Sequence, residues 1–241
     1  MTVIHFNIDQ WRAWAPGLDS ADDWVRWSRS PWQPPAGDEQ PDVGFLPAMQ
    51  RRRLSRLARM AFHVAWPLAE GQPPLPLVFA SRHGETPRTF AILGELARGE
   101  PLSPTQFSLS VHNAIIGLWS ILRGDTSEMT AIAAEGDGLE HAVLEAAALL
   151  AEGAPAVLLV IAEEQPPAAY ADWVDDVPFP YAVGLRLTAG RDWQLSCSSG
   201  AATESSAAWP HALDFILTLL RDGAQCQHQW KTRVWNWQRN P

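Results

Sequence analysis

The sequence predicts an α/β fold in which helices cover a layered sheet. Short apolar segments typical of strands alternate along the chain with amphipathic helical patterns, an order typical of α/β sheets. Residues 155–162 (PAVLLVIA) are continuously apolar, the pattern of a strand that is covered on both faces. No internal repeat and no Pro- or Ser-rich linker divides the chain. We therefore expect one domain over residues 1–241.

The first half of the chain alternates between strands, helices and one irregular stretch. Residues 11–46 are rich in Trp, Pro, Gly and Asp and predict an irregular excursion. A long helix follows, because its apolar residues keep i, i+3, i+4 spacing and Pro47 lies near its first turn. The expected elements are a strand at 1–10, a short helix at 21–28, the long helix at 46–68, a strand at 75–80, a polar loop at 81–85 and a helix at 87–97.

The second half continues the alternation and ends in a tail rich in Trp. An apolar helix containing SVHNAIIGLWSI is followed by a strand of small residues, a Glu-Gly-Asp-Gly bend and a second helix with a clean apolar stripe. The expected elements after that helix are a strand at 155–162, a Pro- and Asp-rich loop at 165–180, strands at 181–187 and 193–198, and a helix at about 210–221.

Composition excludes several classes of protein. The formal net charge of −9 argues against generic nucleic-acid binding. The sequence contains no run of roughly 18 apolar residues, so we expect no membrane span. The first residues, MTVIHFNIDQW, lack the basic and apolar regions of a signal peptide. Cys197 and Cys226 are too few for a disulfide framework and lack metal-site spacing. We expect a cytoplasmic protein with no metal and no cofactor.

Thirteen Trp residues are many for this length. Aromatic residues in polar segments are often anchors of a partner interface, but they can equally pin irregular segments onto the chain's own core. The sequence leaves both interpretations open for Trp11, Trp14, Trp24, Trp27, Trp32, Trp230, Trp235 and Trp237.

The bend at 135–138 is the strongest candidate for a site. A strand that delivers a side chain on a tight turn into a helix is how many α/β enzymes present a nucleophile. The residue delivered here is Glu135, and Gly136 and Gly138 permit the turn. The positive end of the helix favours a carboxylate over its acid, which makes Glu135 a poor base. His83 could be a catalytic base, but it has no recognisable nucleophile to serve, so we expect a structural polar contact from it. Ser110 and His112 would face apart on a helix, so we expect His112 to be a helix residue that is bonded locally.

At this point the sequence resembles a known family. The pairing of SVHNAIIGLWSI with AIAAEGDGLEHAVLEAAALL is similar to the N-terminal half of the β-ketoacyl synthases, which have the thiolase fold. Asn113 and Gly117 match their Asn-x-x-x-Gly pattern, and the resemblance places Glu135 at the position of the nucleophilic Cys. The resemblance covers about residues 40–190 and implies a thiolase-like layered fold, mainly the N-terminal ketosynthase half, with a short atypical C-terminal part at 191–241.

The departures from the family are informative. The resemblance implies that the Cys is replaced by Glu135 and that the two catalytic His segments of the synthases have no counterpart, because His211 and His228 lie in a predicted helix and in the tail. The combination resembles a chain-length-factor-type subunit, above all the short ketosynthase-like proteins of aryl polyene pathways. Such a subunit is non-catalytic and pairs with an active β-ketoacyl synthase.

The resemblance also implies which residues border the partner. We expect a heterodimer with a full-length ketosynthase, indirect contact with an acyl carrier protein, and a partner interface and acyl tunnel lined by Phe107, Ser110, Val111, Asn113, Ala114, Ile115, Gly117 and Leu118. Plain core packing is the alternative for the same segment. One basic set could form a carrier-protein contact, and the alternatives are a solvated face or salt bridges within the acidic protein. Its members are Arg51, Arg52, Arg53, Arg56 and Arg59.

Two other functions remain open from the sequence. The chain could be a stand-alone acyl-thioester hydrolase or malonyl decarboxylase that uses Glu135 with Asp137 or His83. It could also be a carrier-docking protein that uses the arginines without joining a synthase dimer.

Overall fold

A six-stranded mixed sheet forms the centre of the protein in the computed structural model, which describes residues 3–35, 37–174, 176–203 and 208–240. Its strands are β1 (Val3–Trp14), β2 (Leu77–Ala80), β3 (Met129–Ile132), β4 (Val157–Glu163), β5 (Tyr181–Thr203) and β6 (Gln225–Arg239). Their order is β1-β5-β4-β2-β3, and β6 pairs with β5. Strand β2 is parallel to β3 and β4, whereas β5 is antiparallel to β1, β4 and β6. The parallel strands therefore end at one common edge.

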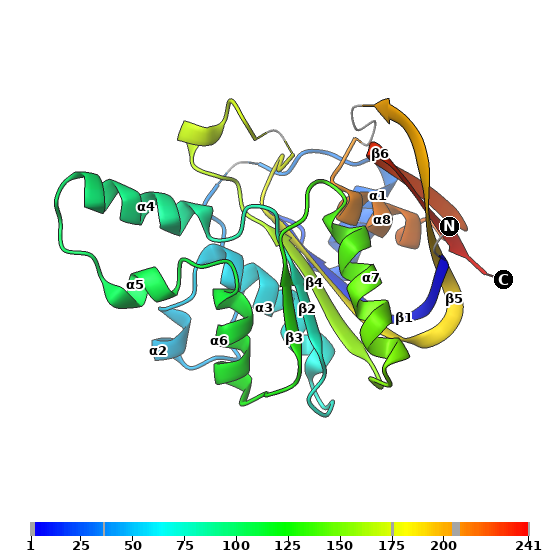
Figure 1. Ribbon diagram of the computed structural model, residues 1–241, viewed down its shortest axis with the longest axis horizontal. Coiled ribbons are helices and arrows are strands. Elements are labelled where there is room, and N and C mark those ends of the chain that lie inside the picture. Colours follow the sequence, from blue (N-terminus) through cyan, green and yellow to red (C-terminus); the bar gives the residue numbers. More distant parts are fainter. Residues whose placement is uncertain (1–2, 36, 175, 204–207, 241) are drawn as a thin grey trace.

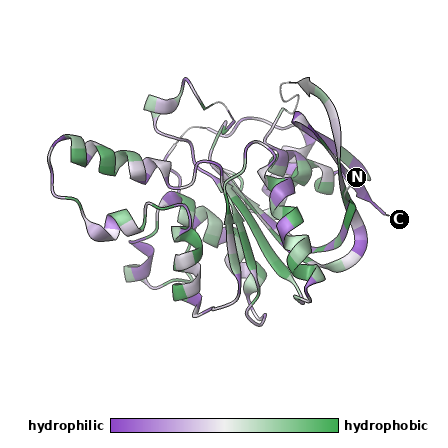
Figure 2. Ribbon diagram, viewed as in Figure 1, coloured by the Kyte–Doolittle hydropathy of each residue, from purple (hydrophilic) through white to green (hydrophobic). Residues whose placement is uncertain are grey.

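Helices cover both faces of the sheet (Figure 1). They are α1 (Ala21–Arg29), α2 (Ala48–Arg51), α3 (Arg56–Ala69), α4 (Thr86–Ala97), α5 (Pro104–Ser108), α6 (Ala114–Arg123), α7 (Gly138–Ala151) and α8 (His211–Leu220), with a 3₁₀ turn at Ala168–Tyr170. Leu159 and Ile161 of β4 face the core under α1, α7 and α8, and Leu158 and Val160 face the core under α3 and α6. Every residue of β4 is buried, as its apolar run predicts up to residue 162, and the acid Glu163 at its end is buried as well. Figure 2 shows the hydrophobic residues concentrated in the central strands. The predicted α/β layered fold is confirmed.

The long helix predicted at 46–68 is wrong in one respect, because the structure has two helices there. Helix α2 ends at Arg51, and α3 begins at Arg56 after a turn. Ser55 caps α3 by accepting a hydrogen bond from the Ala58 N–H at 3.0 Å. A side-chain cap thus starts a second helix, although the apolar periodicity of the sequence continues across the break.

The apolar helix predicted around SVHNAIIGLWSI is also interrupted. Helix α5 ends at Ser108 and α6 begins at Ala114, so His112 lies in a turn and not in a helix. Its Nε2 is 2.7 Å from the Ser81 carbonyl oxygen, after β2. A tertiary hydrogen bond therefore outweighs the helical pattern. Figure 1 shows α4 and α5 extending away from the sheet.

The C-terminal region differs most from expectation. The strands predicted at 181–187 and 193–198 are parts of one strand, β5, and the tail, which was not predicted to be regular, is strand β6. Strand β6 turns back on itself near Lys231, whose φ is 54°, and the Arg239 N–H donates to the Ala224 carbonyl at 2.7 Å. We call residues 225–239 the C-terminal hairpin. Strand β1 extends to Trp14, beyond the predicted end at residue 10, and residues 1–2 of that prediction lie outside the described residues.

Across the residues that the structure describes, no helix has the length and the apolar character needed to cross a lipid bilayer.

Candidate functional site

The bend between β3 and α7 forms an elbow at the carboxyl edge of the sheet. Strand β3 ends at Ile132, α7 begins at Gly138, and the Gly138 N–H donates to the Glu135 carbonyl at 3.1 Å. The indole of Trp230 lies directly over Gly136, where a Cβ atom would be only 2.3 Å from the ring. Glycine at 136 is therefore required by this close approach. Glu135 is delivered on the turn, as predicted, with 44% of its side chain exposed.

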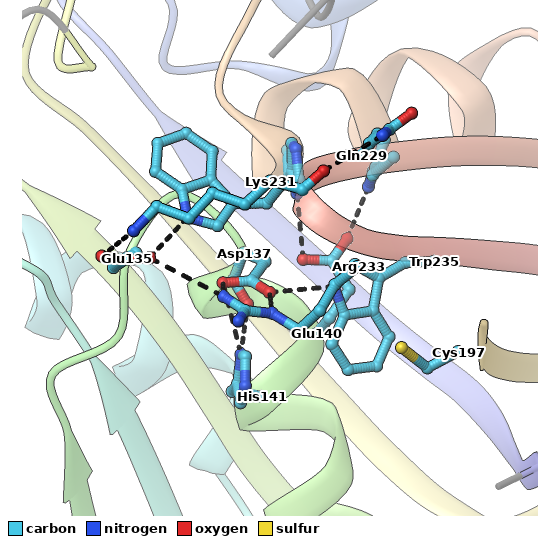
Figure 3. A network of polar contacts seen from close by, with 12 residues as sticks. Glu135, Asp137, Glu140, His141, Cys197, Gln229, Lys231, Arg233 and Trp235 are labelled. Carbon is cyan, nitrogen blue, oxygen red and sulfur yellow. Dashed lines mark hydrogen bonds and ion pairs between the residues drawn. The ribbon is translucent and has the colours of Figure 1, made fainter. Parts of the chain in front are cut away.

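Three acidic residues of the elbow and α7 each bind the C-terminal hairpin (Figure 3). The Glu135 carboxylate accepts a hydrogen bond from Trp230 Nε1 at 2.7 Å and one from Lys231 Nζ at 2.6 Å. Lys231 is 60% exposed, so this contact lies at the protein surface. It ties the tip of the hairpin to the elbow.

The second contact lies deeper. The side chain of Asp137 is fully buried, and Arg233 binds it with two hydrogen bonds, Nε to Oδ2 at 2.5 Å and Nη2 to Oδ1 at 3.0 Å. Trp235 Nε1 donates to the same Oδ2 at 3.0 Å. Two parallel N–H donors from a guanidinium fix both the position and the orientation of a carboxylate.

The third contact lies in the core. Glu140 is fully buried, and its Oε1 accepts from Trp237 Nε1 at 3.2 Å and lies 2.5 Å from His228 Nδ1. Its Oε2 lies 3.1 Å from His211 Nδ1, at the start of α8. The hairpin thus supplies one indole and one basic side chain to each acid. We call these contacts, from Glu135, Asp137 and Glu140 to the hairpin, the hairpin clamp.

The clamp fixes the charge of its members. Hydrogen bonds from Lys231, which has the larger effect, and from Trp230 hold the pKa of Glu135 below its usual range. Burial opposes the charge of Glu140, but His211 and His228 outweigh it and lower its pKa. Burial likewise opposes charge on His228, and contacts with Asp214, Cys226 and Glu140 outweigh it and raise the pKa of His228 to about 12. Glu140 and His228 therefore form a buried ion pair.

Glu140, His211 and His228 each offer a donor atom within 4.8 Å of the others, as a metal site would require. The two imidazole rings, however, are stacked with centroids 4.3 Å apart and planes only 24° apart. A metal ion lies in the plane of each imidazole ring that binds it. Because these two rings are stacked with nearly parallel planes, no point lies in both planes and within bonding distance of both rings. In this arrangement the set forms a hydrogen-bonded cluster around one carboxylate, and the rings do not fit a shared metal ion.

A cavity of about 590 Å³ opens beside the elbow. Its lining includes Ser81 and Arg82 after β2, Glu163 at the end of β4, and the start of α8. Glu163 is 5% exposed, and burial raises its pKa to about 7. The structure places His83 against Asp176, with Nε2 3.0 Å from Oδ1, and His83 is absent from the described lining of the cavity. Glu135 and His83 therefore do not share this cavity.

Comparison with known families and structures identifies the family of this chain. The sequence profile described as "Beta-ketoacyl synthase, N-terminal domain" matches residues 24–238. The chain belongs to the β-ketoacyl synthase family. None of the curated proteins matches it.

Solved structures agree with that family. One chain of the complex of the ketosynthase ApeO with its chain length factor ApeC, from Xenorhabdus doucetiae, is 32% identical, with a TM-score of 0.85; the match covers 98% of this chain and all of that one. The ishigamide ketosynthase/chain length factor matches with a TM-score of 0.63 at 15% identity, over 83% of this chain and 68% of that one. The type II polyketide synthase complex AntDE:AntF matches with a TM-score of 0.67 at 10% identity, over 99% of both chains. The last two show the fold alone, which is the thiolase-like fold of the ketosynthases.

The eight residues predicted to border a partner divide into two groups in this ketosynthase-like fold. Ala114 and Ile115 are 8% and 1% exposed and pack in the chain's own core. Phe107 is 61% exposed and Val111 is 42% exposed. The remaining members are exposed or half-buried: Ser110, Asn113, Gly117 and Leu118. The buried pair fits the core-packing alternative, and the other six stay candidates for a partner interface.

The five predicted arginines lie in and between α2 and α3. None of them forms a salt bridge with the acidic residues that the structure describes, so a solvated face remains the alternative to a carrier-protein contact. Arg51, Arg52 and Arg59 line a hollow of about 310 Å³, and Arg56 lies over the Trp14 ring at 6.0 Å. The break between the two helices means that they do not form one helical face.

The structure shows that several Trp residues pack against or bind the chain's own residues. Trp14, Trp24 and Trp27 are buried in the core, whereas Trp32 is 45% exposed. The hairpin indoles Trp230, Trp235 and Trp237 bind the acids of the elbow and α7. Sequence reasoning missed His211 and His228 as partners of Glu140. The alternation of His228, Trp230, Trp235 and Trp237 with polar residues was the available signal, because alternate residues of a strand share a face.

Proposed function

We propose that this chain is a non-catalytic, chain-length-factor-type subunit that forms a heterodimer with an active, full-length β-ketoacyl synthase. It would stabilise that partner and shape its acyl tunnel in polyketide, aryl polyene or fatty-acid-like biosynthesis. Membership of the β-ketoacyl synthase family supports the proposal, as does 32% identity to a chain of a ketosynthase–chain length factor complex over nearly the whole length.

One observation carries the non-catalytic part of the proposal. The side chain at the elbow, where the resemblance places a nucleophilic Cys, is the carboxylate of Glu135, and that carboxylate is held by Trp230 and Lys231. Lys231 and Trp230 lower the pKa of Glu135, so the group is a weak base. Asp137, the other carboxylate of the bend, is fully buried under Arg233 and Trp235. Neither acid is arranged to attack a thioester or to move a proton.

The proposed interface lies on the exposed side of α5 and α6, beside β3. Among the residues that the structure describes, β3 is an edge strand of the sheet that pairs only with β2, and all four of its residues are half-buried. Helix α6 contacts β3 and carries Ile121, which is 77% exposed, and Phe107 of α5 is exposed as well. An unpaired edge beside an exposed apolar side chain is a surface that a partner would cover. We place the partner ketosynthase there.

The arginines of α2 and α3 are proposed as a contact for the carrier protein. Arg51, Arg52 and Arg59 gather around one hollow in a chain of net charge −9, without salt bridges among the described residues. Guanidinium groups suit phosphate and carboxylate partners. Binding to an acyl carrier protein should weaken as salt increases and fall on Arg52→Glu, whereas Arg26→Glu should leave it unchanged, because Arg26 lies on α1.

Co-purification with a full-length ketosynthase tests the heterodimer, and the chain offers a matched pair of variants. Gly117 in α6 and Gly37 in a loop both have open space where a Cβ would lie, and neither has a positive φ. We expect Gly117→Glu to fold and to lose the ketosynthase, because it places a charge on the proposed interface. Gly37→Glu should retain it. Equal retention of the partner by both variants would remove α6 from the interface.

The alternative, a stand-alone hydrolase or malonyl decarboxylase, has a separate test. Turnover of an acyl or malonyl thioester by the isolated chain, abolished by Glu135→Gln, would favour it over the proposal. We expect no turnover above background from either form.

A further inference from the structure

Helix α4, which follows the loop at residues 81–85, packs only loosely on the rest of the protein. Among the described residues of α4, only Ile92 is buried, and the helix extends away from the sheet (Figure 1). Gly84 and Gly99 flank the helix, and both have a positive φ, 53° and 69°. A few residues at the ends of an element are enough to act as hinges. The position of α4 therefore depends on how the loop before it is held.

One buried acid holds the backbone of this loop. The Glu163 carboxylate is 5% exposed, and it accepts hydrogen bonds from Ser81 Oγ at 3.1 Å and from the backbone N–H groups of Arg82 and His83. Among the described residues, no basic side chain forms a salt bridge with Glu163. Burial therefore raises the pKa of Glu163 to about 7, although the N–H groups of the loop oppose the shift. Burial also raises the pKa of the neighbouring Tyr181 well above its usual value, so that group stays neutral.

Two further acids meet at the end of the loop. Glu85 is 5% exposed, its Oε1 accepts a hydrogen bond from Ser55 Oγ at 2.5 Å, and Arg88 Nε lies 3.5 Å from its Oε2. Burial outweighs these contacts and raises the pKa of Glu85. Glu164, the residue after β4, is half-buried, and burial together with the charge of Glu85 raises its pKa to about 7. Ionisation of both acids would place two like charges close together.

The other cations near the loop do not balance these acids. Asp176 accepts a hydrogen bond from Arg82 Nη1 at 2.7 Å and lies 3.0 Å from His83 Nε2, so both side chains contact a different carboxylate. Arg56 lowers the pKa of Glu164, but by less than burial raises it. The Nε and Nη2 atoms of Arg56 have no hydrogen-bond partner among the described residues. Ionisation around the loop would therefore leave buried negative charge without full compensation.

We call residues 81–85, 163 and 164 the α4 joint, and we propose that this joint is a pH-responsive hinge that loosens and lets α4 move away from the sheet when its acids ionise. The sign follows from linkage. In the closed joint the pKa values of Glu163 and Glu164 are about 7, against 4.5 for an unperturbed Glu. A higher pKa in the closed state stabilises that state at low pH, and the advantage is lost as the pH rises through 7. This inference does not depend on the proposed pairing with a ketosynthase.

Hydrogen exchange of the full chain, read by mass spectrometry, measures how often the amides of α4 open. After correction for the intrinsic pH dependence of exchange, the protection of residues 86–97 should fall about tenfold or more between about pH 5.5 and about pH 7.5. The double change Glu163→Gln with Glu164→Gln should remove most of this fall, because neither amide ionises. Glu95→Gln is the matched control, since it removes a carboxylate later in α4 and should keep the full response.

A single variant protects the test against misfolding. Glu164 is half-buried, so Glu164→Gln should fold, and on its own it should reduce the fall in protection. Constant protection of α4 between the two pH values, an undiminished fall in either Gln variant of the joint, or loss of the response in Glu95→Gln would each overturn the proposal. None of these results would bear on co-purification with a ketosynthase.

Discussion

The contact between Asp137 and Arg233 is the part of the hairpin clamp whose loss should cost most. The carboxylate of Asp137 is fully buried, and Arg233 supplies two of its hydrogen bonds. Removing one partner of a buried ion pair costs about 3–5 kcal/mol, because the other charge is left uncompensated. Arg233 is 37% exposed, so water can replace part of it, and we expect Arg233→Ala to lower the free energy of unfolding by about 2–3 kcal/mol.

Lys231→Ala is the matched control on the same hairpin. Lys231 and Glu135 are 60% and 44% exposed, and exposed pairs contribute at most about 1 kcal/mol. Urea unfolding should separate the two variants, and the melting temperature of Arg233→Ala should fall by about 4–12 °C. The double change Asp137→Asn with Arg233→Met should recover part of the loss, since no buried charge remains. Equal effects of Arg233→Ala and Lys231→Ala, or no effect of Arg233→Ala, would refute the reasoning.

Three further predictions follow from the same contacts. The pKa of His228 is raised from 6.5 to about 12, so its contribution to stability is complete below pH 6.5 and is lost as the pH rises. The free energy of unfolding, measured between pH 6 and 9, should therefore decline less in His228→Gln than in the unchanged protein. Gly136→Ala should destabilise the protein because its methyl group would meet the Trp230 ring, and Trp230→Ala should relieve that loss in the double variant, as thermal unfolding can show. Ser55→Ala should cost about 1–2 kcal/mol in urea unfolding, because Ser55 both caps α3 and donates to Glu85.

The layered α/β fold could be predicted because its strongest signals are local. The continuous apolar run of β4 and the apolar stripe of α7 both reflect burial that follows the geometry of a strand or a helix, and all residues of β4 and of that stripe are buried. The elbow was also predictable, since two glycines beside an apolar helix signal a sharp turn. These features depend on residues close together in the sequence.

The features that were missed depend on residues far apart. The helix around His112 is broken by a hydrogen bond to Ser81, 31 residues away, which no periodicity reveals. The clamp joins Glu140 to His228 across 88 residues. A tail such as QCQHQWKTRVWNWQR carries an alternating pattern, but its polar residues look solvated until the buried acids that they bind are known. Glu135 was therefore correctly placed on the turn, while its partners in the hairpin were not foreseen.

Pairing with a ketosynthase is the central claim, and native mass spectrometry tests it most directly. The chain should be expressed together with an active, full-length ketosynthase from the same source, and the intact assembly weighed. We predict a one-to-one complex whose mass is the sum of the two chains, formed at the expense of ketosynthase homodimer. A chain that remains alone beside an unchanged ketosynthase homodimer would contradict the proposal.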